Sequence, residues 1–337
     1  MPTLRTGRVY AAPDTVHTRE KKRKMSATKT EMAKTMERQP QDLTRILADW
    51  APVEEGAARI AGRRIFVVGT GTSWHAASQG AYFLRLAGAD AVAVSAADCA
   101  LWGPSPTRDD ALVLLSHRGT KRYTSQVLER AHAEGVPTVA IGGEGAPGVD
   151  IATVQPETSG TFTASHLGAL ARLAQLSASL GAELGKLGEV PAAVAAALGG
   201  SGPAVERPER GLELVGAGPN QWTAAEGALK VREAAHLFTE GLAVEQLLHG
   251  PGFALGEGDA LVCLDGGGPG SARVAELAIA IEARGARVYR FRAAELGEPL
   301  SVFPLTVTVQ RIALDFALLL GTDPDDVRPE EWNAIAI

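Results

Sequence analysis

The sequence has few cysteines and few aromatic residues. Of its 337 residues, only 5% are Phe, Trp or Tyr, and the two cysteines, Cys99 and Cys263, lie far apart with no histidine at metal-ligand spacing. We therefore expect two reduced, buried thiols in a cytoplasmic protein, with no metal site and no cofactor.

The sequence also lacks a long apolar run and an excess of positive charge. No run reaches the roughly 18 apolar residues that a membrane span needs, and the N-terminus has no apolar signal core. The formal net charge is −6, which does not suit a nucleic-acid surface. We expect a soluble protein that binds neither a membrane nor nucleic acid.

Hydrophobic residues, by contrast, make up 45% of the chain, and glycine and alanine are abundant. This composition indicates an α/β protein with close helix–sheet packing. Two series of strand, glycine turn and helix follow one another in similar order, which predicts two tandem parallel sheets flanked by helices, in the doubly wound, flavodoxin-like or Rossmann-like class. The predicted strands cover residues 65–68, 91–95, 112–115, 138–141, 151–154, 212–215, 260–264 and 287–291.

Charge and chain-breaking residues divide the sequence further. The basic residues 1–24 are expected to be disordered, either as a basic arm or as a stretch ahead of the true start at Met25. A helix broken by Pro40 is expected over residues 30–50, and another over 52–61. The predicted organisation is a helical arm at 25–62, a first subdomain at 63–190, a linker at 191–210, a second subdomain at 211–320 and a tail at 321–337.

The strongest functional signal lies in residues 223–252. The first half favours a helix, on which Glu226, Lys230 and Glu233 share one face at i, i+4 and i+7. The second half ends with His249 on a Gly-Pro-Gly turn after an apolar helical run. A carboxylate on a helix and an imidazole on a turn suit proton transfer beside a carbonyl. The alternatives are a solvated surface ion pair and a histidine that caps a turn.

Two loops are suited to holding an anion. The strand at 65–68 is followed by G-T-G-T-S and a helix, an arrangement that points free backbone N–H groups at an anion, although a merely tight turn has the same pattern. The strand at 112–115 is followed by S-H-R-G-T-K. Its Arg118 and Lys121 stand at a helix start, where Arg offers bidentate geometry and Lys a point charge.

Residues 225–252 resemble the isomerase domain of glucosamine-6-phosphate synthase, a member of the SIS (sugar isomerase) family. The family motif reads E-G-A-L-K-x-K-E and, after a spacer, H-G-P; this chain reads E-G-A-L-K-V-R-E and then H-G-P. The G-T-G-T-S turn is similar to the family's C-G-T-S, and S-H-R-G-T-K stands where the family has S-Q-S-G-E-T. The fold implied by the resemblance is two tandem SIS subdomains.

The resemblance also implies functions for single residues. Glu233 matches the glutamate that moves a proton between C1 and C2 of a hexose 6-phosphate, with Glu226 and Lys230 holding and tuning it. His249 matches a histidine that helps to open the sugar ring and comes from the neighbouring subunit, which implies a homodimer acting on a small-molecule sugar phosphate. The residues implied to bind the phosphate or a hydroxyl are Thr72, Ser73, Ser116, Arg118, Lys121 and Ser165. An ordinary helix N-cap also explains Ser165.

This chain departs from the family at two places. In the S-H-R-G-T-K loop, Arg118 and Lys121 replace hydroxyls, so either the ligand is more anionic or the loop faces solvent. In the family a lysine shortly after G-T-D forms a Schiff base with the ketose, whereas here Trp332 stands near that place and Lys230 is the last lysine of the sequence. Imine chemistry is then doubtful unless Lys121 or Lys230 has taken it over. We also expect no glutamine hydrolysis, because no glutaminase domain is present.

These observations leave two hypotheses of different classes. The first is a phosphosugar isomerase-type enzyme, for aldose–ketose isomerisation or ammonia-dependent amination or deamination of a hexose phosphate. The second is a non-catalytic sugar-phosphate sensor or regulator, favoured by the absent lysine and disfavoured by the retained acid/base residues. A generic nucleotide-binding α/β protein is the third, although neither glycine turn matches G-x-G-x-x-G.

Overall fold

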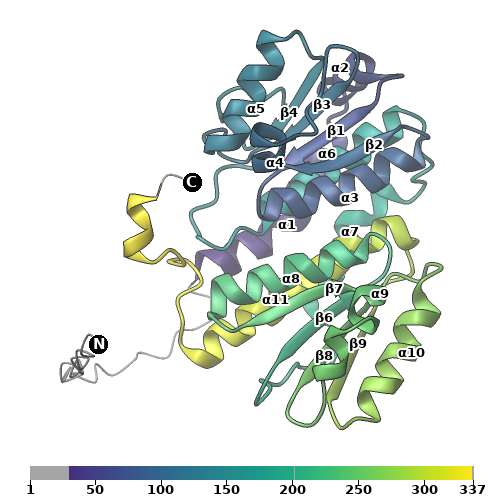
Figure 1. Ribbon diagram of the computed structural model, residues 1–337, viewed down its shortest axis with the longest axis vertical. Coiled ribbons are helices and arrows are strands. Elements are labelled where there is room, and N and C mark those ends of the chain that lie inside the picture. Colours follow the sequence, from purple (N-terminus) through teal and green to yellow (C-terminus); the bar gives the residue numbers. More distant parts are fainter. Residues whose placement is uncertain (1–29, 201, 336–337) are drawn as a thin grey trace, which may run out of the picture.

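The computed structural model describes residues 30–200 and 202–335 (Figure 1). The predicted basic segment at residues 1–24 lies outside the described residues. Within them, the strands form two sheets, stacked one above the other in Figure 1 with helices between them. All strand pairs in both sheets are parallel, so the predicted fold class is confirmed.

The first sheet has the strand order β2-β1-β3-β4-β5. Its strands are β1 (Ile65–Gly69), β2 (Ala91–Ser95), β3 (Ala111–Leu115), β4 (Thr138–Gly142) and β5 (Ile151–Ala152). Every residue of β1, β3 and β4 is buried, because helices cover both faces of the sheet. Strands that are buried on both faces have continuous apolar sequences. The helices of this half are α2 (Ala51–Ile60), α3 (Thr72–Leu86), α4 (Ala96–Leu101), α5 (Arg122–Ala133) and α6 (Ala164–Ser179).

The second sheet has the strand order β7-β6-β8-β9. Its strands are β6 (Leu212–Gly216), β7 (Thr239–Ala243), β8 (Ala260–Asp265) and β9 (Arg287–Arg292). Its helices are α8 (Asn220–Ala235), α9 (Val244–Leu248), α10 (Ser271–Glu282) and the short 3-10 helix η3 (Pro251–Ala254). In each half the first strand lies between the second and the third, so both halves wind in the same order.

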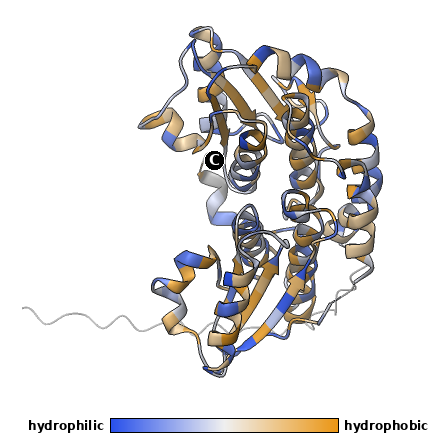
Figure 2. Cartoon of the chain, turned by 90° about the vertical axis from the view of Figure 1, so that its right-hand side faces the viewer, coloured by the Kyte–Doolittle hydropathy of each residue, from blue (hydrophilic) through white to orange (hydrophobic). Residues whose placement is uncertain are grey.

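The remaining helices are α1 (Glu31–Ala48), η2 (Leu187–Glu189), α7 (Val190–Gly199), α11 (Glu298–Leu320) and η4 (Glu330–Ala334). Of these, α1, α7 and α11 contribute side chains to the cores of both halves. Side chains of α11 belong to the cores of both halves: Phe303 packs with the first and Phe316 with the second. Figure 2 shows the strands of both sheets mainly in the hydrophobic colour, with hydrophilic segments on the outer helices.

Three local predictions were wrong or incomplete. The helix over residues 30–50 is not broken by Pro40, since α1 runs through that residue, with Met36, Leu43 and Ile46 buried along it. Strand β7 and helix α11 were not predicted. Among the described residues, α11 is the one helix with the length and apolar composition of a membrane span, and 67% of that window is buried inside the protein, as in a core helix.

The two cysteines behave as predicted. Cys99 and Cys263 are free thiols, and both are buried. Burial raises the pKa of Cys263 to about 12 and also raises the pKa of Cys99, so both thiols stay protonated at neutral pH.

Candidate active site

A cavity of about 510 Å³ opens at the carboxyl edge of the first sheet. Strand β1 lies between β2 and β3, so the chain leaves β1 and β3 toward opposite sides of the sheet, and a crevice forms outside their ends. The cavity is lined by the loops after these two strands, the first turn of α6, one face of α8 and the segment 325–332. Its volume is sufficient for a phosphorylated hexose.

The loop after β1 depends on two glycines. Gly71 has φ +58°, and a Cβ on Gly69 would lie 2.3 Å from the carbonyl oxygen of Ser73. This tight turn starts α3 at Thr72, so that the first backbone N–H groups of the helix face the crevice. Thr72 and Ser73, the predicted ligand-binding residues of this loop, both line the cavity, but the Thr72 hydroxyl already donates to Glu226 Oε1 at 3.1 Å.

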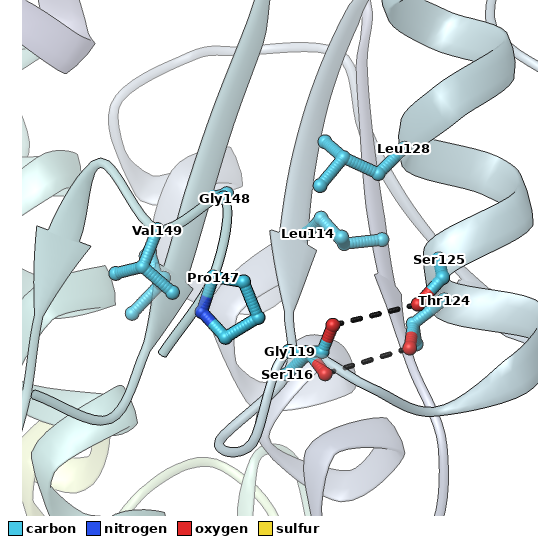
Figure 3. A pocket seen from close by; sticks show the side chains of 11 residues that line it. Leu114, Ser116, Gly119, Thr124, Ser125, Leu128, Pro147, Gly148 and Val149 are labelled. Carbon is cyan, nitrogen blue, oxygen red and sulfur yellow. Dashed lines mark hydrogen bonds between the residues drawn. The ribbon is translucent and has the colours of Figure 1, made fainter. Parts of the chain in front are cut away.

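The loop after β3 places Ser116, Arg118 and Lys121 along the cavity. The hydroxyl of the buried Ser116 lies 3.4 Å from the Thr124 hydroxyl at the start of α5. Figure 3 shows this contact, together with a small hollow behind the loop that Leu114, Leu128 and Pro147 also line. That hollow holds about 10 Å³, at most one water molecule, so it is not a ligand site.

Three cations surround one part of the cavity. The Arg118 guanidinium stacks 5.1 Å from the centre of the Phe162 ring, and the Arg328 guanidinium donates to the carbonyls of Trp332 and Ile335. Arg118, Lys121 and Arg328 line the same cavity. Burial and the two neighbouring guanidinium groups lower the pKa of Lys121. In the described part of the chain, none of the three forms an ion pair with a carboxylate. Their charges are available to an anion in the cavity.

The helix α8 supplies a buried row of charges. Lys230 Nζ lies 2.6 Å from Glu233 Oε2 and 3.5 Å from Glu226 Oε1, and the side chains of Lys230 and Glu226 are 1% and 0% exposed. A solvated surface pair is therefore excluded. Lys230 and Glu233 line the cavity, while Glu226 lies behind them. His75, on α3, adds a second partner at 2.7 Å from Glu226 Oε2.

These contacts fix the charges of the pair. Burial alone would raise the pKa of Glu226, but Lys230, His166 and His75 overcome it and lower the pKa to about 2. For Lys230, burial opposes the charged form, and the two glutamates nevertheless raise its pKa above the usual 10.5. Glu226 is thus a carboxylate and Lys230 an ammonium at neutral pH.

The first turn of α6 brings Ser165 and His166 to the cavity. Glu157, which is 4% exposed, caps this helix: its carboxylate accepts from the backbone N–H groups of Thr163 and Ser165 at 2.9 and 2.7 Å. Ser165 is therefore not the capping residue, and its side chain faces the cavity. His166 is 1% exposed, and burial lowers its pKa to about 4.

His249 is the one predicted residue that lies away from this site. Its side chain is 78% exposed, its nearest charged partner is Glu245 at 3.6 Å, and it does not line the cavity. The other nine predicted residues come together in the structure: eight of them line the cavity, and Glu226 lies directly behind it in contact with Lys230.

The C-terminal segment also lines the cavity. Residues 325–329 and Trp332 line it. The segment is fixed to the first half, because Gly160 N–H donates to the Asp325 carbonyl at 2.8 Å and the Asp325 carboxylate accepts from Glu31 and Met32 N–H groups at the start of α1. Trp332 thus lies at the ligand cavity, near the place where the resemblance predicts a lysine.

Several residues of the site were not predicted from the sequence: His75, His166, Phe162, Glu157 and Arg328. They come from four separate segments, and no local spacing connects them with α8. His117 was noted only as a replacement in its loop. Only His166 had a signal in the sequence, because it directly follows Ser165 in the T-x-S-H segment at the start of α6.

Comparison with known proteins agrees with this geometry. The SIS domain family model matches residues 60–147. The glutamine–fructose-6-phosphate aminotransferase [isomerizing] of Sphingobium yanoikuyae is 30% identical over 138 residues, which cover 36% of this chain and 88% of that protein. The Pyrococcus horikoshii protein of the same name is 26% identical over 304 residues, 79% of this chain and 50% of that protein. The chain therefore spans about half the length of the latter relative.

Solved structures show the same fold. Tagatose-6-phosphate ketose/aldose isomerase from Escherichia coli aligns with a TM-score of 0.77 at 18% identity, over 91% of this chain and 98% of that one. Glucosamine-6-phosphate deaminase from Thermotoga maritima aligns with a TM-score of 0.75 at 20% identity, over 88% of this chain and 97% of that one.

Proposed function

Because this chain belongs to the SIS (sugar isomerase) family, we propose that it is an enzyme that interconverts the aldose and ketose forms of a hexose phosphate. The relatives described above support a phosphosugar isomerase-type function at the level of the family. Because the chain spans about half of some relatives, their complete reactions do not transfer to it. Amination or deamination of the same sugar is the related possibility.

The observation that carries this proposal is the position of Glu233. Its carboxylate lines the same cavity as the three cations and is held at 2.6 Å by the buried Lys230. A base beside a carbonyl needs such a fixed position, because proton abstraction requires contact with the carbon acid. We assign to Glu233 the transfer of the proton between C1 and C2, and to Glu226 and Lys230 the task of holding it.

We further propose that Arg118, Lys121 and Arg328 bind the phosphate, with help from Ser73 and Ser116. A phosphate carries up to two negative charges and three acceptor oxygens, which three adjacent cations match. The N-termini of α3 and α5 flank the same place and add to the positive field. The loop that departs from the family motif is thereby a phosphate site that uses cations in place of hydroxyls.

Lys121 and Lys230, the two lysines that were considered for imine chemistry, differ in the direction in which the protein changes their pKa. An amine must lose its proton before it attacks a carbonyl. Two glutamates raise the pKa of Lys230, which keeps it protonated, whereas burial and two arginines lower the pKa of Lys121. If an imine forms at all, we assign it to Lys121. Isomerisation through an enediol needs no imine.

His249 remains a predicted ring-opening residue that acts in the cavity of a second copy of the chain. Its exposed position on the turn before η3 is compatible with that function. The proposed assembly is a homodimer, and the proposed location is the cytoplasm.

A sugar-phosphate sensor is the second candidate, favoured by Trp332 at the cavity. An aromatic ring binds the face of a sugar but carries out no proton transfer. The two candidates are distinguished by incubating the protein with fructose 6-phosphate, glucose 6-phosphate and glucosamine 6-phosphate, and by recording proton NMR spectra beside thermal unfolding. Interconversion of the sugars supports the enzyme. Stabilisation without any conversion supports the sensor and contradicts the isomerase.

A further inference from the structure

His166 is a buried histidine that faces the cavity without a side-chain partner. It lies on the first turn of α6, is 1% exposed and lines the cavity together with Ser165. In the described part of the chain, neither of its two buried ring nitrogens has a side-chain partner, and the one polar group that interacts with the ring by hydrogen bonding is the backbone of Thr72. Buried polar groups are nearly always paired, so such a nitrogen indicates a partner that is supplied by a ligand.

The surroundings of His166 keep its ring uncharged. The charged and titratable groups that act on it are Glu226, His75 and Lys230, and a backbone hydrogen bond with Thr72 opposes the effect of burial on its pKa. Burial lowers its pKa to about 4, and the nearby carboxylate of Glu226 only partly opposes this. At neutral pH the imidazole therefore carries one N–H donor and one free acceptor nitrogen.

Several other polar groups in this part of the site are already engaged. Lys230 is bound by two glutamates, and the Thr72 hydroxyl donates to Glu226. The Nε2 atom of His117 accepts from the Glu157 N–H at 3.4 Å, whereas its buried Nδ1 faces Gly143 and has no partner among the described residues. His166 is thus the imidazole beside the buried charges of α8 whose two ring nitrogens both lack a side-chain partner in the described part of the chain.

We propose that His166 is a catalytic residue that donates a hydrogen bond to the substrate oxygen on which negative charge develops. This inference rests on the proposed isomerase function. A preorganised donor in a buried site strongly stabilises an oxygen on which negative charge develops. A neutral imidazole carries no charge that would bind the ground state of the substrate equally well, so its hydrogen bond favours the transition state.

The proton balance of the step from ketose to aldose uses both residues. Glu233 takes the proton from C1, the C1–H electron pair forms the C1=C2 bond, and the π pair of the carbonyl moves to O2. His166 gives its N–H proton to O2 and takes the O1–H proton on its other nitrogen. The O1 electrons then form the aldehyde, and Glu233 returns its proton to C2. Glu233 finishes as a carboxylate, and His166 finishes as a neutral ring with its proton on the other nitrogen, so exchange of that proton restores the first tautomer before the next turnover.

The first experiment observes His166 in the unmodified protein. Protein labelled with ¹⁵N-histidine is studied by two-bond ¹H–¹⁵N NMR from pH 7 to 5, and His166→Asn identifies the signal. We expect a neutral ring across this range and a change of its nitrogen shifts when arabinonate 5-phosphate, an acid that resembles the enediolate, is added. A ligand that raises the melting temperature without moving the His166 signal overturns the proposal, and so does a charged ring at pH 7.

The second experiment measures isomerisation by variants. We expect His166→Phe to lose about 100- to 1,000-fold in kcat, the effect of removing one such donor, with KM changed only a few-fold. His166→Asn should recover part of the loss, since its amide retains a donor. The matched control is His132→Phe, which changes an exposed histidine on α5 and should leave kcat unchanged.

The outcomes separate the two levels of the proposal. If the wild-type protein isomerises a sugar phosphate and folded His166→Phe retains its kcat, the function stands and the assignment of His166 is wrong. If the wild-type protein converts no sugar phosphate, the isomerase function itself is wrong, and the catalytic role of His166 falls with it.

Discussion

Replacing Lys230 with methionine tests how the buried charges of α8 stabilise the protein. Methionine preserves an unbranched side chain but removes the charge from a position that is 1% exposed. The variant leaves Glu226, at 0% exposure, with only His75 and Thr72 as partners, and it frees Glu233 from its 2.6 Å contact. The expected result is a large loss of stability at neutral pH.

Two arguments give the size of this loss. Removing one member of a buried ion pair costs about 3–5 kcal/mol, because the other charge stays buried without compensation. The pKa of Glu226 falls from the usual 4.5 to about 2, and at ~1.4 kcal/mol per pKa unit its ionised form contributes about 3 kcal/mol. We expect Lys230→Met to lower the free energy of unfolding by about 3–5 kcal/mol at pH 7.

The pH dependence follows from the direction of that pKa change. Because the pKa of Glu226 is lower in the folded protein, its stabilisation is complete above the unfolded pKa near 4.5 and is lost as the pH falls toward 2. Lys230→Met removes the cause, so the difference between wild type and variant should shrink across this pH range.

Urea unfolding followed by circular dichroism measures both effects. The matched control is Lys34→Met, which breaks an exposed ion pair of the same 2.6 Å length and should leave the unfolding midpoint unchanged. The double variant Glu226→Gln/Lys230→Met should be more stable than Lys230→Met alone. A loss for Lys230→Met no larger than for Lys34→Met, or the same loss at pH 7 and pH 3, would refute the reasoning.

Three further predictions concern the cavity. Arg118→Ser and Lys121→Thr, measured by thermal unfolding against inorganic phosphate, should each weaken phosphate binding by about 10- to 100-fold, because a hydrogen bond to a charged group is worth about 1.5–3 kcal/mol. Trp332→Lys should form an adduct with fructose 6-phosphate that borohydride traps and mass spectrometry detects, while the wild type forms none through Trp332. Mixing the inactive variants Glu233→Gln and His249→Ala should restore up to about a quarter of the activity if sites are shared between subunits; no recovery contradicts a shared site.

The fold was predictable wherever the strands are buried on both faces. The residues of β1 and β3 are apolar throughout, and the two windings repeat in the same order. Strand β7 was missed because it has little apolar pattern: it lies at the edge of its sheet, and its Gly241 is needed where a Cβ would lie 2.1 Å from the Ala224 carbonyl. That contact is between segments that only the fold brings together.

Proline misled the prediction of helices. Pro40 removes one backbone donor from α1, and the helix continues because burial of Met36, Leu43 and Ile46 outweighs the loss. The helix α11 has proline at two positions and several β-branched residues, a sequence that disfavours helix by propensity. Its position between two cores overrides that preference.

The acid/base part of the site was predictable because its residues share one helix, and the loops after β1 and β3 were predictable because each follows a buried strand and leads into a helix. Glu226, Lys230 and Glu233 follow from helical spacing, and the structure adds that they are paired and buried or half-buried. His75 and His166 come from α3 and α6, and their approach to Glu226 depends on the packing of these helices. No sequence spacing expresses such a contact.

The central claim is that Glu233 moves a proton on a sugar phosphate, and solvent exchange tests it most directly. Wild type, Glu233→Gln and Glu276→Gln, a control at an exposed position on α10, are incubated with fructose 6-phosphate in D₂O and followed by proton NMR. We predict that deuterium enters at C1 or C2 with the wild type and the control but not with Glu233→Gln. Equal exchange with Glu233→Gln, or no exchange with a wild type that fructose 6-phosphate stabilises, would contradict the claim.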